Sequence, residues 1–258
     1  MKIFYTLILA ACSIAASAQT DTIHLKDKRL MTTNLTTGTK QYLVYFQSPA
    51  KSKVLSTSLW MRDIKTETRN NIPVIVTNQH WYGADSAQYR SITSVNRKAD
   101  FAPIYHSETI GTKTKAYNWY ADKVAGDSTV TGNTAQGFSQ DTKEYPFNWN
   151  LDIETFEMLP LAAGKTFALY FYDAGTVPPA YVVYKVAGSE MLSLLDNQKV
   201  ECWKLVHEGN FRGSAYIQTF WISKKSHEFI KEEDAFNGGY RYKVKLPGAA
   251  TDILKRFK

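Results

Sequence analysis

Hydrophobic and polar side chains alternate along the C-terminal part of the chain. In residues 240–246, tyrosine, valine and leucine take every second position, and basic residues such as Arg241 and Lys243 lie between them. A period of two places successive side chains on opposite faces and is typical of a β-strand. Asn237 and Gly238 come just before this segment and accept positive φ at little cost, so they predict a hairpin turn. We therefore expect an antiparallel meander at residues 199–208, 215–223, 227–233 and 240–246.

The rest of the chain carries further strand patterns. Residues 167–172 and 181–187 are apolar on both faces, which indicates central strands that are covered on both sides. Pro178 and Pro179 separate these two segments. Further strands are predicted at residues 41–46, 54–62, 72–81, 86–96, 102–110 and 115–125.

Residues 150–159 are the one good helix candidate. Asn150 or Asp152 can cap this helix, acidic residues occupy its first turn, and Pro160 stops it. We therefore expect an all-β, mainly antiparallel fold with one short helix, arranged as a curved meander sheet, a β-roll or a sandwich-like structure. Residues 19–258 are expected to form a single large β domain. A polar loop predicted at residues 126–146 is the place where two sheet-rich halves would divide, should the domain be split.

Residues 1–18 are predicted to be a secretory signal peptide. Lys2 supplies a positive charge, an apolar stretch follows, and Ala16-Ser17-Ala18 is a small-x-small cleavage site whose ending resembles signal peptides of Bacteroidetes. We expect an exported protein, periplasmic or secreted, without a transmembrane segment, because no apolar run is long enough to span a bilayer. The alternative is an outer-membrane lipoprotein, since residues 9–12 resemble a lipoprotein box that would place a lipid anchor on Cys12.

Charge and composition limit the other classes of function. The formal net charge is +7, but no run of five like charges occurs, so we expect no nucleic-acid partner. The five histidines lack the spacing of paired metal ligands, and no nucleophile-elbow motif occurs, so we expect no metal, no cofactor and no catalytic residue. If Cys12 leaves with the leader, Cys202 has no disulfide partner, and its strand-like setting favours a small buried side chain.

Aromatic and charged positions supply the candidate ligand-binding residues. These are Trp149, Asp152, Tyr172, Trp221, Arg241 and Lys243. The aromatic residues would line a groove for a lipid or a sugar, or else form the core between sheet layers. The two basic residues would bind phosphate or carboxylate, or else form a solvated outer face. Asp152, Glu154 and Glu157 together resemble the acids of a glycosidase, although a helix dipole alone also favours acids there.

Four sequence segments carry a family resemblance. They are Phe-Asn-Trp-Asn-Leu-Asp at 147–152, Cys-Trp-Lys-Leu at 202–205, Phe-Trp-Ile-Ser-Lys-Lys at 220–225 and Tyr-Arg-Tyr-Lys-Val at 240–244. These segments resemble exported proteins grouped as domain of unknown function 3108. The resemblance implies a strand-rich, curved sheet in the cell envelope, and it brings no catalytic residues with it. It also suggests an analogy of fold with periplasmic lipoprotein carriers, whose bent sheet wraps around acyl chains.

Three functional hypotheses follow from the sequence. The first is a non-catalytic ligand-binding or envelope-maintenance protein with an apolar or glycan ligand. The second is an exported glycan-acting hydrolase that uses the acids near Trp149. The third is a structural or adhesive module that binds another envelope protein and therefore presents an exposed apolar patch.

Overall fold

The computed structural model describes residues 20–47, 56–211 and 213–247, so the predicted leader and Cys12 lie outside it. The strands are β1 (Thr20–Ile23), β2 (Gly38–Gln47), β3 (Ser56–Arg69), β4 (Ile72–Tyr82), β5 (Arg90–Arg97), β6 (Pro103–Ile110), β7 (Lys113–Trp119), β8 (Lys123–Gly126), β9 (Ser139–Asp141), β10 (Phe147–Asn148), β11 (Thr166–Tyr172), β12 (Ala180–Ser193), β13 (Lys199–Phe211), β14 (Ser214–Ser223), β15 (Phe229–Phe236) and β16 (Gly239–Lys245). The helical elements are α1 (Asp152–Glu157) and 3-10 turns at Leu25–Asp27, Thr32–Asn34, Ser86–Gln88 and Trp149–Leu151.

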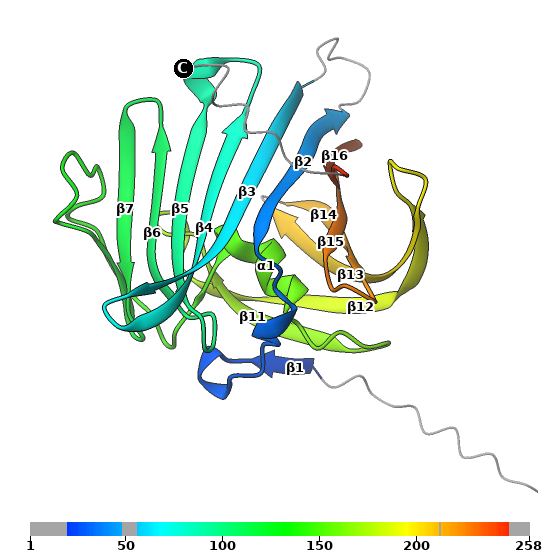
Figure 1. Ribbon diagram of the computed structural model, residues 1–258, viewed down its shortest axis with the longest axis horizontal. Helices are drawn as coiled ribbons and strands as arrows, with labels where there is room; N and C mark the ends of the chain where they lie inside the picture. The colour runs from blue at the N-terminus through cyan, green and yellow to red at the C-terminus, as the bar shows by residue number, and fades with distance from the viewer. Residues whose placement is uncertain (1–19, 48–55, 212, 248–258) are drawn as a thin grey trace, which may run out of the picture.

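The strands of the described chain form one mixed sheet of 16 strands, which bends around α1 (Figure 1). Its order is β1-β11-β12-β13-β14-β15-β16-β2-β3-β4-β5-β6-β7-β8-β9, and β10 pairs with β11. β1 and β10 run parallel to β11, and the other strand pairs are antiparallel. Segments far apart in the sequence meet in the sheet, because the last strand, β16, pairs with the second, β2.

The predicted all-β, mainly antiparallel fold with one short helix is confirmed. Strands β13 to β16 form the expected meander, in which each strand pairs with the next. Asn237 and Gly238 make the last hairpin turn, with φ of 48° and 72°. The local turn chemistry therefore sets the register of β15 against β16.

Three strand predictions are wrong in detail. The strand expected at residues 86–96 begins only at Arg90, because Ser86–Gln88 form a 3-10 turn. β12 is not covered on both faces, because Tyr181 and Val183 are exposed on its outer side. Residues 115–125 form two strands, β7 and β8, where one was expected. The chain turns between them, and the Tyr120 N–H donates a hydrogen bond to the Lys123 carbonyl at 2.9 Å.

The helix is shorter than predicted. It spans Asp152–Glu157 and follows a 3-10 turn at Trp149–Leu151. The cap of this turn is Asn148, whose side chain accepts a hydrogen bond from the Asn150 N–H at 3.0 Å. The observed cap therefore precedes both predicted caps, Asn150 and Asp152. The sequence pattern did not separate the 3-10 turn from the helix that follows it.

The main apolar core packs against one side of α1 from strands β11 to β14, and it extends to Tyr42, Ile64 and Ile75 of β2 to β4. Phe156 is fully buried, and its ring centroid lies 4.8 Å from both Tyr184 and Phe220. Phe171 of β11 contacts the same ring at 6.2 Å. Burial and aromatic contact fix this side of the helix.

A bulge in β12 shapes one end of the molecule. The register between β12 and β13 shifts between Val186 and Ser189. Gly188 lies in the bulge with φ of 126°, a conformation that favours glycine. The hairpin beyond this bulge, residues 194–198, lines a pocket together with the turn between β14 and β15.

Candidate functional site

The second side of α1 is acidic and faces basic side chains of the sheet. Glu154 forms an ion pair with Arg62 of β3, and its side chain is only 1% exposed. Glu157 accepts hydrogen bonds from Lys40 of β2 at 3.1 and 2.9 Å, and from the Phe229 N–H at 2.9 Å. Burial raises the pKa of Glu157, and the nearby Lys40 opposes that shift. These buried pairs connect α1 to two neighbouring strands, at a cost in desolvation.

A second charged group lies on the inner face of β15 and β16. The hairpin register places Glu232 opposite Lys243 and Asp234 opposite Arg241. Glu232 forms ion pairs with both cations, and Arg241 Nε donates to Asp234 at 2.6 Å. Burial and the neighbouring Glu232 raise the pKa of Asp234 from 3.8 to about 6, while Arg241 lowers it. Burial also acts to raise the pKa of Glu232, but Lys243 and Arg241 outweigh it and hold that pKa below its usual value.

Asp152 connects the two charged groups. Its carboxylate lies 3.7 Å from a guanidinium nitrogen of Arg62. Burial raises the pKa of Asp152, and the charges of Lys243 and Arg62 counteract it. Charged side chains of both signs thus extend from Asp234 on β15 through α1 to Lys40 on β2. We call these residues, which the structure brings together, the charged interior: Lys40, Arg62, Asp152, Glu154, Glu157, Glu232, Asp234, Arg241 and Lys243.

Three of the six candidate residues belong to the charged interior. Arg241 and Lys243 do not form a solvated outer face, because their side chains face buried acids; Lys243 is 2% exposed. Asp152 joins them from α1. Trp149 precedes the helix and packs edge-to-face on Phe171, with ring centroids 5.1 Å apart. The inner face of the sheet therefore collects the predicted charged residues in one place.

Tyr172 and Trp221 lie elsewhere. Tyr172 is buried in a separate cluster, 5.8 Å from the Trp119 ring. Trp221 neighbours the core residue Phe220 in β14 and so points to the outer face, where Lys231 lies 4.4 Å from its ring centroid. These two residues do not belong to the charged interior.

Sequence patterns missed a stacked pair of tryptophans on the inner face. Trp60 of β3 and Trp81 of β4 are cross-strand partners, with ring centroids 3.7 Å apart and an interplanar angle of 2°. Arg90 lies 4.6 Å from the Trp81 ring, and Lys243 lies 4.9 Å from the Trp60 ring. A cation above the face of an indole ring stabilises such a stack. Its partners come from different strands, and only the tertiary register brings them together.

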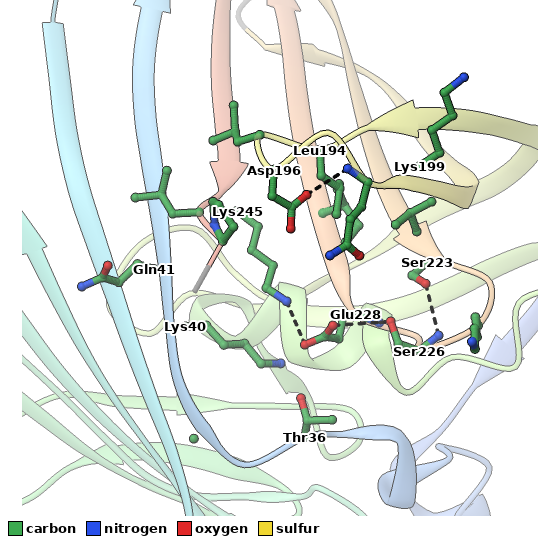
Figure 2. A pocket seen from close by; sticks show the side chains of 18 of the residues that line it. Thr36, Lys40, Gln41, Leu194, Asp196, Lys199, Ser223, Ser226, Glu228 and Lys245 are labelled. Carbon is green, nitrogen blue, oxygen red and sulfur yellow. Dashed lines mark hydrogen bonds and ion pairs between the residues drawn. The ribbon is translucent and has the colours of Figure 1, made fainter. Parts of the chain in front are cut away.

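A pocket of about 800 Å³ lies at the strand ends beside the charged interior (Figure 2). Four segments form its walls: residues 36–41, 194–201, 223–230 and 245–247. Hydrogen bonds hold these segments, because the Leu246 N–H donates to the Gln41 carbonyl at 2.9 Å and the Ser223 N–H donates to the Glu228 carbonyl at 2.8 Å. The volume falls within the range of about 300–1,000 Å³ that is usual for small-molecule sites.

The pocket is lined by charged and hydroxyl side chains with a few apolar ones between them. Lys245 of β16 donates a hydrogen bond to Glu228 at 2.8 Å, as Figure 2 shows. Burial acts to raise the pKa of Glu228, but Lys245 and Lys40 outweigh it and hold the carboxylate ionised. Lys40 lies at the inner wall, where it also reaches Glu157. The pocket therefore shares a residue with the charged interior.

Two other reactive side chains, Cys202 and His106, are buried. Cys202 is a free thiol, and burial raises its pKa to about 12, which confirms the expected small buried side chain. His106 lies 3.0 Å from the Ser94 hydroxyl, and burial lowers its pKa to about 4, so it is neutral at pH 7. No group of three metal-ligating side chains occurs among the residues that the structure describes. Within the same residues, no helix has the length and hydrophobicity to cross a bilayer.

The described chain thus has an all-β fold, in which one bent, open sheet encloses a short helix and a pocket lies at the strand ends. The family model for a protein of unknown function, DUF3108, matches residues 41–245, so the chain belongs to this family. The fold is similar to the crystal structure of a β-barrel-like protein of domain of unknown function DUF1849 from Brucella abortus. That likeness has a TM-score of 0.51 and 9% identity, and covers 82% of this chain and 98% of the other. No curated protein matches this chain.

Proposed function

We propose that this chain is an exported, non-catalytic protein of the bacterial envelope that binds a polar ligand in the pocket of Figure 2. The observation that carries this proposal is the pocket of about 800 Å³ built from four separate segments. Its walls are strand ends and short turns held by backbone hydrogen bonds. Pre-formed walls favour binding, because little conformational freedom is lost when the ligand enters.

The charges of the pocket favour a ligand with an acidic group. Lysines outnumber acids among the lining residues by five to three: Lys40, Lys199, Lys224, Lys225 and Lys245 against Asp196, Glu201 and Glu228. Three of the lysines are held by carboxylates, at 2.9 Å for Lys40, 2.5 Å for Lys224 and 2.8 Å for Lys245. Lys225 is exposed and has no ion pair within the described residues, so it is available for a carboxylate or phosphate.

Export is part of the proposal and rests on the leader. The charged start, the apolar stretch and the Ala16-Ser17-Ala18 site favour cleavage and release into the periplasm or the medium. Lipidation of Cys12 is the alternative, and it would place the same domain on a membrane. Mass spectrometry of the mature N-terminus separates these two outcomes.

The glycan hydrolase is the weaker hypothesis. A glycosidase needs one carboxylic acid that is protonated near neutral pH and reaches the substrate. Glu154 and Glu157 are each 1% exposed and paired with a cation, which counts against that role. In the pocket, the pKa of Glu228 is lowered rather than raised, so this side chain is a poor general acid.

A protein-interaction module is the second candidate function. Met191 and Leu195 of the β12–β13 hairpin are 58% and 63% exposed, which is unusual for side chains of this size. Capture of one specific envelope protein by the purified chain, abolished by M191S, would favour this function over ligand binding, because Met191 does not line the pocket.

Native mass spectrometry tests the proposed function. We expect protein purified from its native host to carry a bound mass that is lost on denaturation. T36W places an indole in the pocket and should abolish this mass, because Thr36 is exposed and lines the pocket. T33W is the matched control, since Thr33 is also exposed but does not line it. An unliganded mass, together with no thermal shift from carboxylated or phosphorylated sugars, would contradict the proposal.

A further inference from the structure

A smaller hollow of about 230 Å³ lies on the inner face at the far ends of β14 and β15. Tyr216 and Phe236 are cross-strand partners in its wall, and Gln218 and Asp234 are the next pair on the same face. The hollow thus has two aromatic side chains at its rim and an amide and a carboxylate beside them. It is separate from the pocket of Figure 2, with which it shares no lining residue.

Contacts within the protein fix the Tyr216 side of the hollow in the absence of a ligand. The Tyr216 ring lies against Gly209 of β13, where a Cβ atom would collide with the ring. His207 Nδ1 lies 2.9 Å from the Val183 carbonyl and therefore carries the proton. Its other nitrogen, Nε2, accepts a hydrogen bond from the Tyr216 hydroxyl at 3.1 Å. A side chain fixed at both ends loses little entropy on binding.

The carboxylate of Asp234 lies beside charges of both signs. Gln218 Nε2 donates to one oxygen at 3.2 Å, and Arg241 Nε donates to the other at 2.6 Å. Arg241 is itself neutralised by Glu232, which also holds Lys243. Burial, and after it the charge of Glu232, raise the pKa of Asp234, and Arg241 compensates for these two effects only in part. A cation in the hollow would complete that compensation.

We propose that this hollow binds a small organic ammonium group, with Asp234 as its counter-ion and the rings of Tyr216 and Phe236 as its walls. Aromatic faces attract ammonium groups, and a carboxylate supplies the opposite charge. The volume of about 230 Å³ limits the ligand to a single head group or one sugar residue. An amino sugar and an ethanolamine head group both carry this chemistry.

Isothermal titration calorimetry with two amines and their neutral counterparts tests the proposal. We expect glucosamine, ethanolamine or both to bind the mature protein at pH 7.5, where Asp234 is ionised. N-acetylglucosamine and ethylene glycol should bind at least tenfold more weakly. Binding of only one amine would support the proposal and identify the source of the ammonium group. Equal binding of the neutral compounds, or no binding of either amine, would overturn it.

Three variants locate the site. D234N should weaken amine binding at least tenfold, because it removes the counter-ion and keeps the shape of the side chain. G209A should weaken it severalfold through displacement of the Tyr216 ring, and it leaves all charges in place. E208Q is the matched control, since Glu208 is exposed and lies one residue away, on the opposite face of β13. Unchanged affinity in both D234N and G209A would assign the amine to another place and overturn the proposal.

Discussion

The two sides of α1 are held against the sheet by different kinds of interaction. On one side, Phe156 packs against the aromatic rings of β11, β12 and β14. On the other, Glu154 and Glu157 meet Arg62 and Lys40 of β3 and β2. Hydrophobic burial tolerates small changes of angle, whereas buried ions must meet partners at fixed distances. The apolar side therefore supplies most of the stability, and the charged side fixes the orientation in which the helix docks.

The apolar side should give the largest effect on stability. F156A removes a fully buried ring that contacts three others, so we expect a loss of about 4 kcal/mol in the free energy of unfolding. Urea denaturation followed by tryptophan fluorescence measures it. Y240A, which truncates an exposed ring on β16, is the control and should cost less than about 1 kcal/mol. A loss below about 1 kcal/mol in F156A would show that α1 is not packed as described.

Substitutions on the charged side of α1 should have the second largest effect on the free energy of unfolding. E154Q leaves Arg62 buried with only Asp152 at 3.7 Å as a counter-charge, so we expect a loss of about 3 kcal/mol. E67Q removes one partner of the exposed pair with Arg69 and should cost less than about 0.5 kcal/mol. The double variant R62M/E154M should recover part of the loss, because no buried charge of this pair remains and Asp152 keeps Lys243 as a nearby cation. A double variant that is less stable than E154Q would show that the ion pair itself stabilises the fold.

The pH dependence of stability tests the part of the charged interior on β15. The pKa of Asp234 is about 6 in the folded protein and near 3.8 in an unfolded chain, so the folded state binds this proton more tightly. Stability from this group is therefore gained as pH falls from about 7 to 4, and we expect a gain of about 2 kcal/mol. D234N cannot titrate, so the difference in unfolding free energy between wild type and D234N should change by that amount. A difference that is constant between pH 4 and 7 would contradict this expectation.

A substitution on the outer face of the sheet should have the smallest effect on the free energy of unfolding. Cys202 packs with Trp221 and Ile230 in a small cluster that is separate from the main core. C202A removes one buried sulfur, so we expect a loss of about 1 kcal/mol, measured by the same denaturation. A loss as large as that of F156A would mean that the outer cluster, rather than α1, stabilises the sheet.

Much of the fold follows from local patterns in the sequence. The alternation in residues 240–246 and the turn at Asn237 and Gly238 were enough to predict β16 and its hairpin. The same register also contained the pairing of Glu232 with Lys243 and of Asp234 with Arg241, since residues that flank a two-residue turn face each other in order. The sequence prediction placed Arg241 and Lys243 either in a ligand site or on a solvated face, and neither alternative pairs them with the acids of β15.

The rest of the site depends on contacts far apart in the sequence. Arg62 and Glu154 are separated by 92 residues, and no local pattern pairs them. The pocket combines four segments that meet only because β16 pairs with β2 and because β12 bends at its bulge. A period of two shows that side chains share a face, but it does not show which face becomes the interior. The inward direction of Lys243 therefore required the tertiary structure.

Co-crystallisation tests the central claim most directly, namely that the charged interior is structural and that the ligand occupies the pocket at the strand ends. The mature protein, purified from its native host without a refolding step, should be crystallised and examined for unassigned electron density. We predict density in the pocket beside Lys245 and Glu228, with the ion pairs between α1 and the sheet intact. Density between Asp152 and Arg62 that separates these side chains, with only water in the pocket, would contradict the account.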